Sequence, residues 1–273
     1  MIFSMTLITR NRIFILARTL SFLVYALSIA IFVHYFSIGL IVQPDSQKIK
    51  PFIFQYNYNA VLISIFTFLF YTLAAQFFVY RNFVRTRATE ILFFSTFLLS
   101  CISEILRLFV PIDGLASNYS AMYLLIGQGI LFGRLLAPLS FLFIALMSGN
   151  SQRINEEKNL TVIIFTAMLF SSIIPVNSAI ITKFCTFKWG YSLLIDFFRM
   201  TVSSIAVFSM FLQASKSDSQ EDFKISFGFA AMQAGYLILC KTDSYELLCA
   251  GSLLLFAGTY IYIKLLHKKY LWI

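Results

Sequence analysis

The chain has 273 residues, of which 59% are hydrophobic and 18% aromatic, while only 12% are charged. That charged fraction is about half the usual share in a soluble domain, and the mean hydropathy of +0.83 likewise excludes a water-soluble enzyme and a disordered tail. The net charge of +9 does not indicate a nucleic-acid partner, because the basic residues stand in short clusters between apolar runs.

The apolar runs predict the fold class. A helix crosses the hydrocarbon core of a membrane with about 20 residues, which predicts an all-α polytopic membrane bundle of eight transmembrane helices. The seventh run is the shortest. As a helix it would rise only about 24 Å, so it also fits a re-entrant segment. In chain order, the predicted spans are 19–42, 58–80, 88–110, 119–147, 160–182, 191–214, 225–240 and 247–266.

The polar break at 43–57 divides the chain into two parts. Residues 1–57 are predicted to form an anchor helix with its outer loop, and residues 58–273 a seven-helix membrane core with a short cytoplasmic tail. The first run follows a basic start, as in a secretory signal, but it is longer and no A-x-A-like cleavage site follows, which favours an uncleaved anchor. All connections are short, so any function must lie within the helices or their loops.

The 21 basic residues predict the orientation in the membrane. With the N-terminus in the cytoplasm, thirteen of them fall on the inner side and five on the outer side, while three lie inside apolar runs. This asymmetry agrees with the positive-inside rule. We therefore expect both termini in the cytoplasm.

Five charged residues lie inside the predicted spans, where charge is costly and usually faces the bundle interior. Glu104 and Arg107 are three residues apart on one span, as are Asp196 and Arg199 on another, so each pair shares a helix face. Arg134 lies near the middle of a third span. We interpret all five as candidate ligand- or ion-binding residues of an outward-opening site with net charge +1, suited to a small anion or zwitterion. Structural ion pairs that join three helices are the open alternative.

Small residues at helical spacing predict close helix packing. Gly129 and Gly133 form a GxxxG motif on the fourth span, and Ala231 and Gly235 form a similar pair on the seventh. Such residues let two backbones approach, either within one chain or between two copies. Pro138 and Pro175 are expected to kink or end turns in the fourth and fifth spans.

No residue set indicates catalysis, and the sequence predicts neither a metal nor another cofactor. The four cysteines contain no CxxC, and the two histidines have no neighbour at ligand spacing. Glu104 and Asp196 each have an arginine three residues on, which suits binding better than acid catalysis. Cys185 and Cys240 both fall at the predicted outer face, where a disulfide or two free thiols would fit.

Three stretches carry a family resemblance: Tyr80-Arg81-Asn82-Phe83-Val84-Arg85, Glu104-Ile105-Leu106-Arg107, and Gly133-Arg134-Leu135-Leu136-Ala137-Pro138. With their place in the helix layout, they make residues 58–266 resemble the N-terminal seven-helix sensor region found ahead of some bacterial histidine kinases. The resemblance implies a ligand-sensing fold in the inner membrane of a bacterium. We expect no kinase domain beyond residue 273, so the output would pass to a separate signalling protein.

The sequence thus favours a non-catalytic sensor or receptor-like module, surrounded by the lipid bilayer, with a small polar or anionic ligand. A small-solute transporter or permease that uses the same charges is the first alternative, although transporters usually show paired halves with broken helices, which the sequence does not. A membrane lipid-modifying enzyme is the second alternative, and it would need a nucleophile or metal set that the pattern does not offer.

Overall fold

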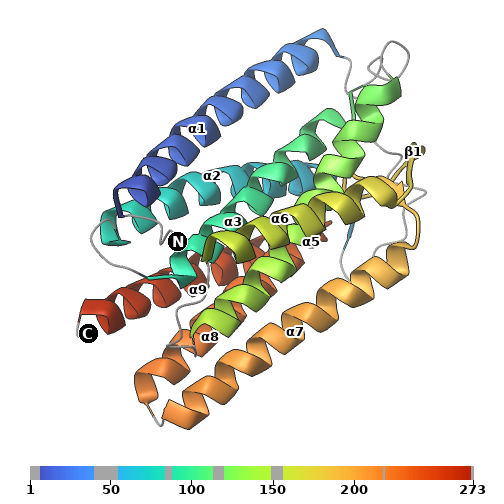
Figure 1. Ribbon diagram of the computed structural model, residues 1–273. Coiled ribbons are helices and arrows are strands. Elements are labelled where there is room, and N and C mark those ends of the chain that lie inside the picture. Colours follow the sequence, from blue (N-terminus) through green and yellow to red (C-terminus); the bar gives the residue numbers. More distant parts are fainter. Residues whose placement is uncertain are drawn as a thin grey trace.

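A computed structural model describes residues 7–39, 55–83, 88–112, 120–148, 156–217 and 219–271, so most of the predicted outer loop 43–57 lies outside it. The described residues form a bundle of long helices with one short β-hairpin (Figure 1). In chain order, the elements are α1 (Leu7–Ile38), α2 (Tyr58–Phe83), α3 (Glu90–Ser103), the 3-10 helix η2 (Glu104–Phe109), α5 (Ser120–Ser148), α6 (Glu156–Ile173), β1 (Val176–Ile181), β2 (Phe187–Trp189), α7 (Ser192–Ser217), α8 (Gln220–Cys240) and α9 (Tyr245–Leu271).

Seven helical segments of the described chain are long and apolar enough to cross a membrane. They confirm the predicted class, a helical multi-pass membrane protein, but the predicted count of eight is not confirmed. The short seventh run is part of α8, which has 21 residues. The seven segments are Ile15–Ile38, Tyr58–Phe83, Glu90–Phe109, Ala121–Ser148, Ser192–Ser217, Gln220–Cys240 and Tyr245–Leu271.

The predicted span 160–182 differs most from the structure. The helix α6 ends at Ile173, and the residues after Pro175 form strand β1, which pairs antiparallel with β2. A proline lacks the backbone N–H that continues a helix and disfavours helical geometry in the residue before it. The remaining apolar residues of this run therefore belong to a hairpin rather than to the end of a membrane helix.

The helices run roughly along one axis (Figure 1). The first turn of α1 and the last turn of α9 lie at one end of the bundle, here called the terminal end, and the hairpin lies at the other, here called the hairpin end. Helix α6 runs beside α5 between these two ends. Helix α1 lies at the periphery against α2, where Gln76 Nε2 donates a hydrogen bond of 2.9 Å to Ser21 Oγ.

The small residues lie where two helices of the same chain meet. A Cβ atom on Gly133 would lie 2.9 Å from the Ser100 carbonyl oxygen on α3, and one on Gly235 would lie 2.8 Å from the Gly251 carbonyl oxygen on α9. Gly129 faces Leu106 of η2, and the Ala231 backbone lies against Gly258 of α9. The pairs α3–α5 and α8–α9 therefore pack backbone to backbone, which fixes Arg134 against η2.

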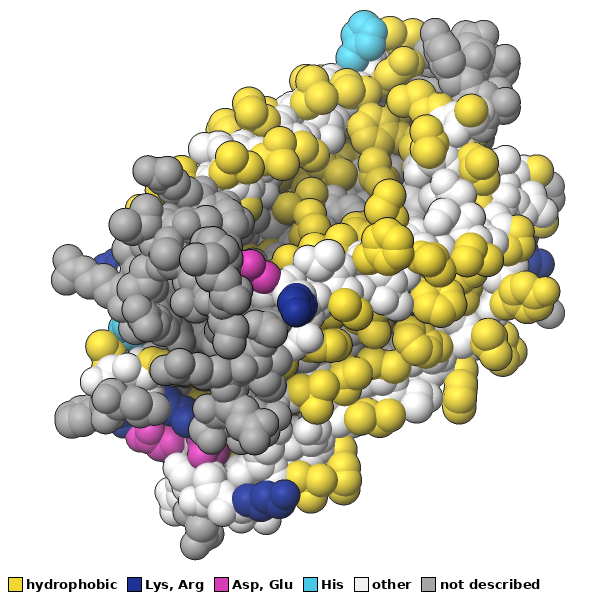
Figure 2. Space-filling model, viewed as in Figure 1, with side chains coloured by type: hydrophobic (Ala, Val, Ile, Leu, Met, Phe, Trp, Pro, Cys, Tyr) yellow, Lys and Arg dark blue, Asp and Glu magenta, His cyan; other side chains and the backbone are white. Residues whose placement is uncertain are grey.

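The outer surface and the interior share an apolar character. Large hydrophobic side chains cover much of the face in Figure 2, and Leu193 on α7 is 84% exposed. Inside, aromatic rings stack below the hairpin end: the ring centroids of Phe97 and Phe141 are 4.5 Å apart, and those of Phe141 and Phe229 are 5.7 Å apart. An apolar exterior around an apolar core matches a protein whose surroundings are lipid.

Candidate ligand-binding site

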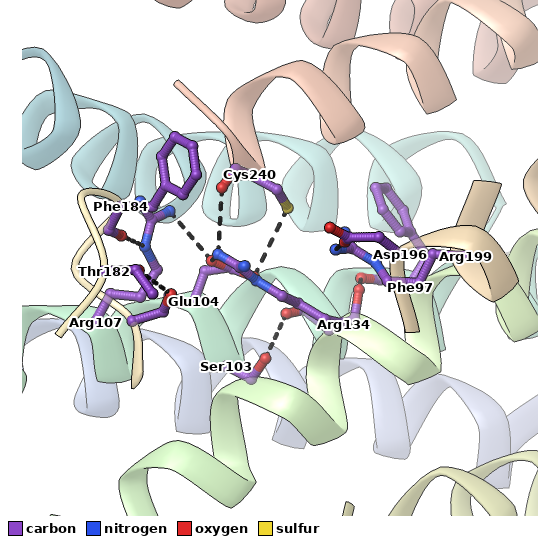
Figure 3. A network of polar contacts seen from close by, with 12 residues as sticks. Phe97, Ser103, Glu104, Arg107, Arg134, Thr182, Phe184, Asp196, Arg199 and Cys240 are labelled. Atoms are coloured by element: carbon purple, nitrogen blue, oxygen red, sulfur yellow. Dashed lines mark hydrogen bonds and ion pairs between the residues drawn. The ribbon is translucent and has the colours of Figure 1, made fainter. Parts of the chain in front are cut away.

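Glu104 forms the centre of a buried ion cluster at the hairpin end (Figure 3). It opens η2, and its side chain is fully buried. Arg134 of α5 donates from Nε to Glu104 Oε1 at 2.9 Å and from Nη2 to Oε2 at 3.2 Å. Arg107 adds a third bond, from Nη1 to Oε2 at 3.2 Å. Three of the five charges singled out in the sequence therefore meet, and two guanidinium groups share one carboxylate.

The hairpin and the end of α8 enclose this cluster. Arg107 Nε donates to the Phe184 carbonyl oxygen at 3.0 Å, and Arg134 Nη2 donates to the Cys240 carbonyl oxygen at 3.3 Å. The Arg134 guanidinium also lies 5.2 Å from the ring centroid of Trp189. Sequence reasoning missed these contacts, because a backbone carbonyl has no residue signature and Trp189 has the pattern of an interfacial aromatic.

Asp196 and Arg199 form a separate pair on α7. Arg199 Nη1 lies 3.4 Å from Asp196 Oδ1, while Lys241 Nζ lies 2.8 Å from Asp196 Oδ2. The Arg199 side chain is 2% exposed, but the Asp196 side chain is 40% exposed. In the view of Figure 3, Arg134 lies between Arg107 and Arg199. The pair thus joins a buried guanidinium beside the cluster to a carboxylate at the surface.

Cationic groups outnumber anionic ones around this site. Glu104 and Asp196 supply two negative charges, and Arg107, Arg134, Arg199 and Lys241 supply four positive charges, a net charge of +2. Three buried guanidinium nitrogens have no hydrogen-bond partner among the described residues: Arg107 Nη2, Arg199 Nε and Arg199 Nη2. Arginine stays protonated in proteins, so these atoms are open donors in an electropositive site.

A second ion pair fastens the hairpin to the turn between α8 and α9. Lys183 Nζ lies 2.6 Å from Oδ2 of Asp243, whose side chain is fully buried. Nearby, burial raises the pKa of the Cys185 thiol to about 11 and that of the Tyr56 phenol to about 12. Cys185 and Cys240 are both free thiols. The turn of the hairpin is therefore held by two contacts, Arg107 with the Phe184 carbonyl and Asp243 with Lys183.

The donor set suits anions rather than metal ions. Among the described residues, no three His, Cys, Asp or Glu side chains are placed together to hold a metal ion. The groups that converge at the hairpin end are N–H donors with surplus positive charge, which recognise carboxylate or phosphate oxygens. Fold and site together define a multi-pass helical membrane protein with a buried, arginine-rich polar cluster at one end.

Comparison of the chain with protein-family models, with curated proteins and with solved structures finds no match.

Proposed function

We propose that the chain is a non-catalytic sensor or receptor-like membrane module whose ligand binds at the hairpin end. The observation that carries this proposal is the set of open donors. Within the described part of the chain, Arg107 and Arg199 keep three unpartnered guanidinium nitrogens, and their side chains are at most 2% exposed. Buried N–H groups without acceptors are costly. A small polar ligand would supply the missing acceptors, so binding would be favourable at this place.

The layer below the site favours sensing over transport. Tyr236, Phe97 and Phe141 lie between the ion cluster and the terminal end. The Tyr236 ring meets the other two edge to face, with its centroid 5.4 Å from that of Phe97 and 6.2 Å from that of Phe141. All three rings are at most 1% exposed. A transport pathway needs polar groups that continue to the other face, whereas a receptor needs access from one face only.

The distribution of basic residues supports an orientation in which the terminal end faces the cytoplasm and the ligand site faces outward. Basic residues such as Lys216, Lys268 and Lys269 lie in the terminal-end turns of their helices. By the positive-inside rule, the terminal end would face the cytoplasm and the hairpin end the outside of a bacterial inner membrane. Helix α6 would be the eighth crossing, since its 18 residues extend about 27 Å. The output would pass to a separate signalling protein at the cytoplasmic face.

Trp189 offers a direct readout of binding, because its ring lies over Arg134. In a Trp272→Phe background it is the sole tryptophan of the chain. The purified full chain in phosphatidylcholine proteoliposomes is titrated with glycine, acetate and inorganic phosphate, with chloride at matched ionic strength as control. We expect a saturable change in Trp189 emission and no uptake of the same labelled solutes into the vesicles.

Two results would overturn the proposal. Solute accumulation that disappears in Asp196→Asn would establish a transporter. The absence of any saturable Trp189 response to the three probes, in protein that unfolds cooperatively on heating, would contradict a binding site for small polar ligands at this end.

A further inference from the structure

The edge of the Arg199 guanidinium carries two adjacent open donors. Arg199 lies on α7 and uses only Nη1, in its 3.4 Å contact with Asp196, while Nε and Nη2 have no partner among the described residues. The side chain is 2% exposed. Because a guanidinium cannot release its proton, this edge is a fixed, charged, two-pronged donor in a nearly dry place.

Arg134 shows what such an edge binds in this protein. The same two nitrogens, Nε and Nη2, hold the two oxygens of the Glu104 carboxylate at 2.9 and 3.2 Å. This two-point geometry matches planar carboxylate and the oxygens of phosphate. The Arg199 edge has the same donors, but the carboxylate beside it, on Asp196, lies at Nη1 and is shared with Lys241.

Tyr236 on α8 carries a third open donor in this part of the bundle. Its ring packs against Phe97 of α3, with ring centroids 5.4 Å apart. The Tyr236 hydroxyl is buried and unpartnered among the described residues, and it lies within electrostatic range of Arg199 and Glu104. A phenol donates one hydrogen bond to an anion, so α7 and α8 together supply three open donors within electrostatic range of one another.

Access to this position is from the hairpin-end surface. Asp196 and Lys241 link Arg199 to that surface, and their side chains are 40% and 47% exposed. Asp196 is also the resident anion nearest to Arg199. An incoming anion would compete with it, and Lys241 would retain the displaced carboxylate.

We infer that the ligand of the proposed receptor site carries a carboxylate or phosphate group, held by Arg199 Nε and Nη2 and by the Tyr236 hydroxyl, and that it enters past Asp196. This inference rests on the proposed function and narrows it to one ligand chemistry. A free carboxylate or phosphate and the phosphate of an anionic lipid headgroup would both fit these donors.

The test titrates acetate and inorganic phosphate into the full chain in phosphatidylcholine nanodiscs, with Trp189 emission and the thermal unfolding midpoint as readouts. We expect saturable stabilisation, at least tenfold weaker affinity in Arg199→Gln, and about threefold weaker affinity in Tyr236→Phe. Asp196→Asn should bind more tightly, because the competing carboxylate is gone. Arg81→Gln, which removes an exposed arginine at the terminal end, is the matched control and should bind as the wild type does.

Two further measurements keep the test decisive. If Arg199→Gln fails to fold, Arg199→Lys keeps the charge without the two-pronged edge, and it should fold and still lose at least tenfold in affinity. Nanodiscs that contain phosphatidylglycerol distinguish a free anion from a lipid headgroup as the ligand. If added phosphate gives a response in phosphatidylcholine nanodiscs but none in phosphatidylglycerol nanodiscs, the lipid headgroup is the occupant.

The outcomes distinguish this inference from the proposed function. Glycine binding that is unchanged in Arg199→Gln, without any effect of acetate or phosphate, would overturn the anion inference and leave a receptor. Arg199-dependent accumulation of phosphate inside proteoliposomes would overturn the receptor and leave the anion site.

Discussion

Glu104 and Arg107 have the same spacing along the chain as Asp196 and Arg199, yet the two pairs occupy opposite environments. The Glu104 carboxylate is fully buried and accepts hydrogen bonds from two arginines, whereas the Asp196 side chain is 40% exposed and shares its contacts with a surface lysine. Both arginines are buried. The two pairs therefore differ in how deeply the acid lies, although a three-residue spacing places both acids beside their arginines.

The difference comes from the elements packed around each pair. Glu104 faces α5, where Gly133 brings the backbone of Arg134 close to α3, and the hairpin covers Arg107. Asp196 is in the second turn of α7, which leaves it at the edge of the bundle beside Lys241. Close packing of a helix that carries a small residue thus buries the Glu104–Arg107 pair. No such packing covers Asp196, so its carboxylate stays exposed to the surroundings.

The largest effect should come from neutralising Glu104, with Asp196 as the matched comparison. Glu104→Gln leaves two buried guanidinium groups without their shared carboxylate, and we expect it to lower the free energy of unfolding by about 3–5 kcal/mol. Asp196→Asn, the matched exposed position, should change it by less than about 1 kcal/mol. Unfolding by sodium dodecyl sulfate in mixed micelles measures both. Equal losses would show that the two acids do not differ in depth.

The second largest effect on stability should come from breaking the ion pair that holds the hairpin over the cluster. Lys183→Met removes the cation next to the buried Asp243 carboxylate and should destabilise the protein by about 2–3 kcal/mol. Lys188→Met, on the exposed face of the same hairpin, is the control and should have little effect. The same unfolding titration applies, and Trp189 emission should shift toward longer wavelength only in Lys183→Met. Identical behaviour of both variants would mean that this ion pair does not hold the hairpin closed.

The third effect tests the contact between α3 and α5. Gly133→Ala places a methyl group onto the Ser103 side chain and against the Ser100 carbonyl oxygen of α3, and it should cost about 1–3 kcal/mol because Ser103 and α5 must move. Gly258→Ala, at the α8–α9 contact, should cost a similar amount. Only Gly133→Ala should alter Trp189 emission, through displacement of Arg134. A similar emission change in both variants would contradict the specific role of Gly133.

The smallest effect is on thiol reactivity and leaves stability unchanged. With a pKa of about 11, Cys185 carries less than about 0.1% thiolate at pH 7.5, and the thiolate is the reactive form. Iodoacetamide should therefore modify Cys185 slowly at pH 7.5, at a rate that rises about tenfold per pH unit below its pKa. Peptide mass spectrometry measures this rate. Rapid modification of Cys185 at pH 7.5 would show that the hairpin opens readily.

The sequence predicts the parts of this molecule that depend on composition and spacing. Long apolar runs suffice for a multi-pass helical protein, and scarcity of charge is enough to single out Glu104, Arg134 and Arg199. The hairpin was not predicted, because β1 is a short stretch of the same apolar residues that end a membrane helix. The depth of Glu104 was not predicted either, since it depends on Gly133 and on the Phe184 carbonyl, which only the packing of distant segments brings close.

The hairpin is continuous with two long helices, and this gives it a mechanical consequence. Gly190 N–H donates to the Pro175 carbonyl oxygen at 2.8 Å, which clamps the base of the hairpin where α6 ends and α7 begins. Helix α7 has 26 residues and extends about 39 Å to the terminal end. A displacement of the hairpin by 1–2 Å, the scale of common helix shifts, would therefore shift α7 along its axis. The far end of α7 lies beside the start of α8, and a movement that begins at the hairpin end would arrive there.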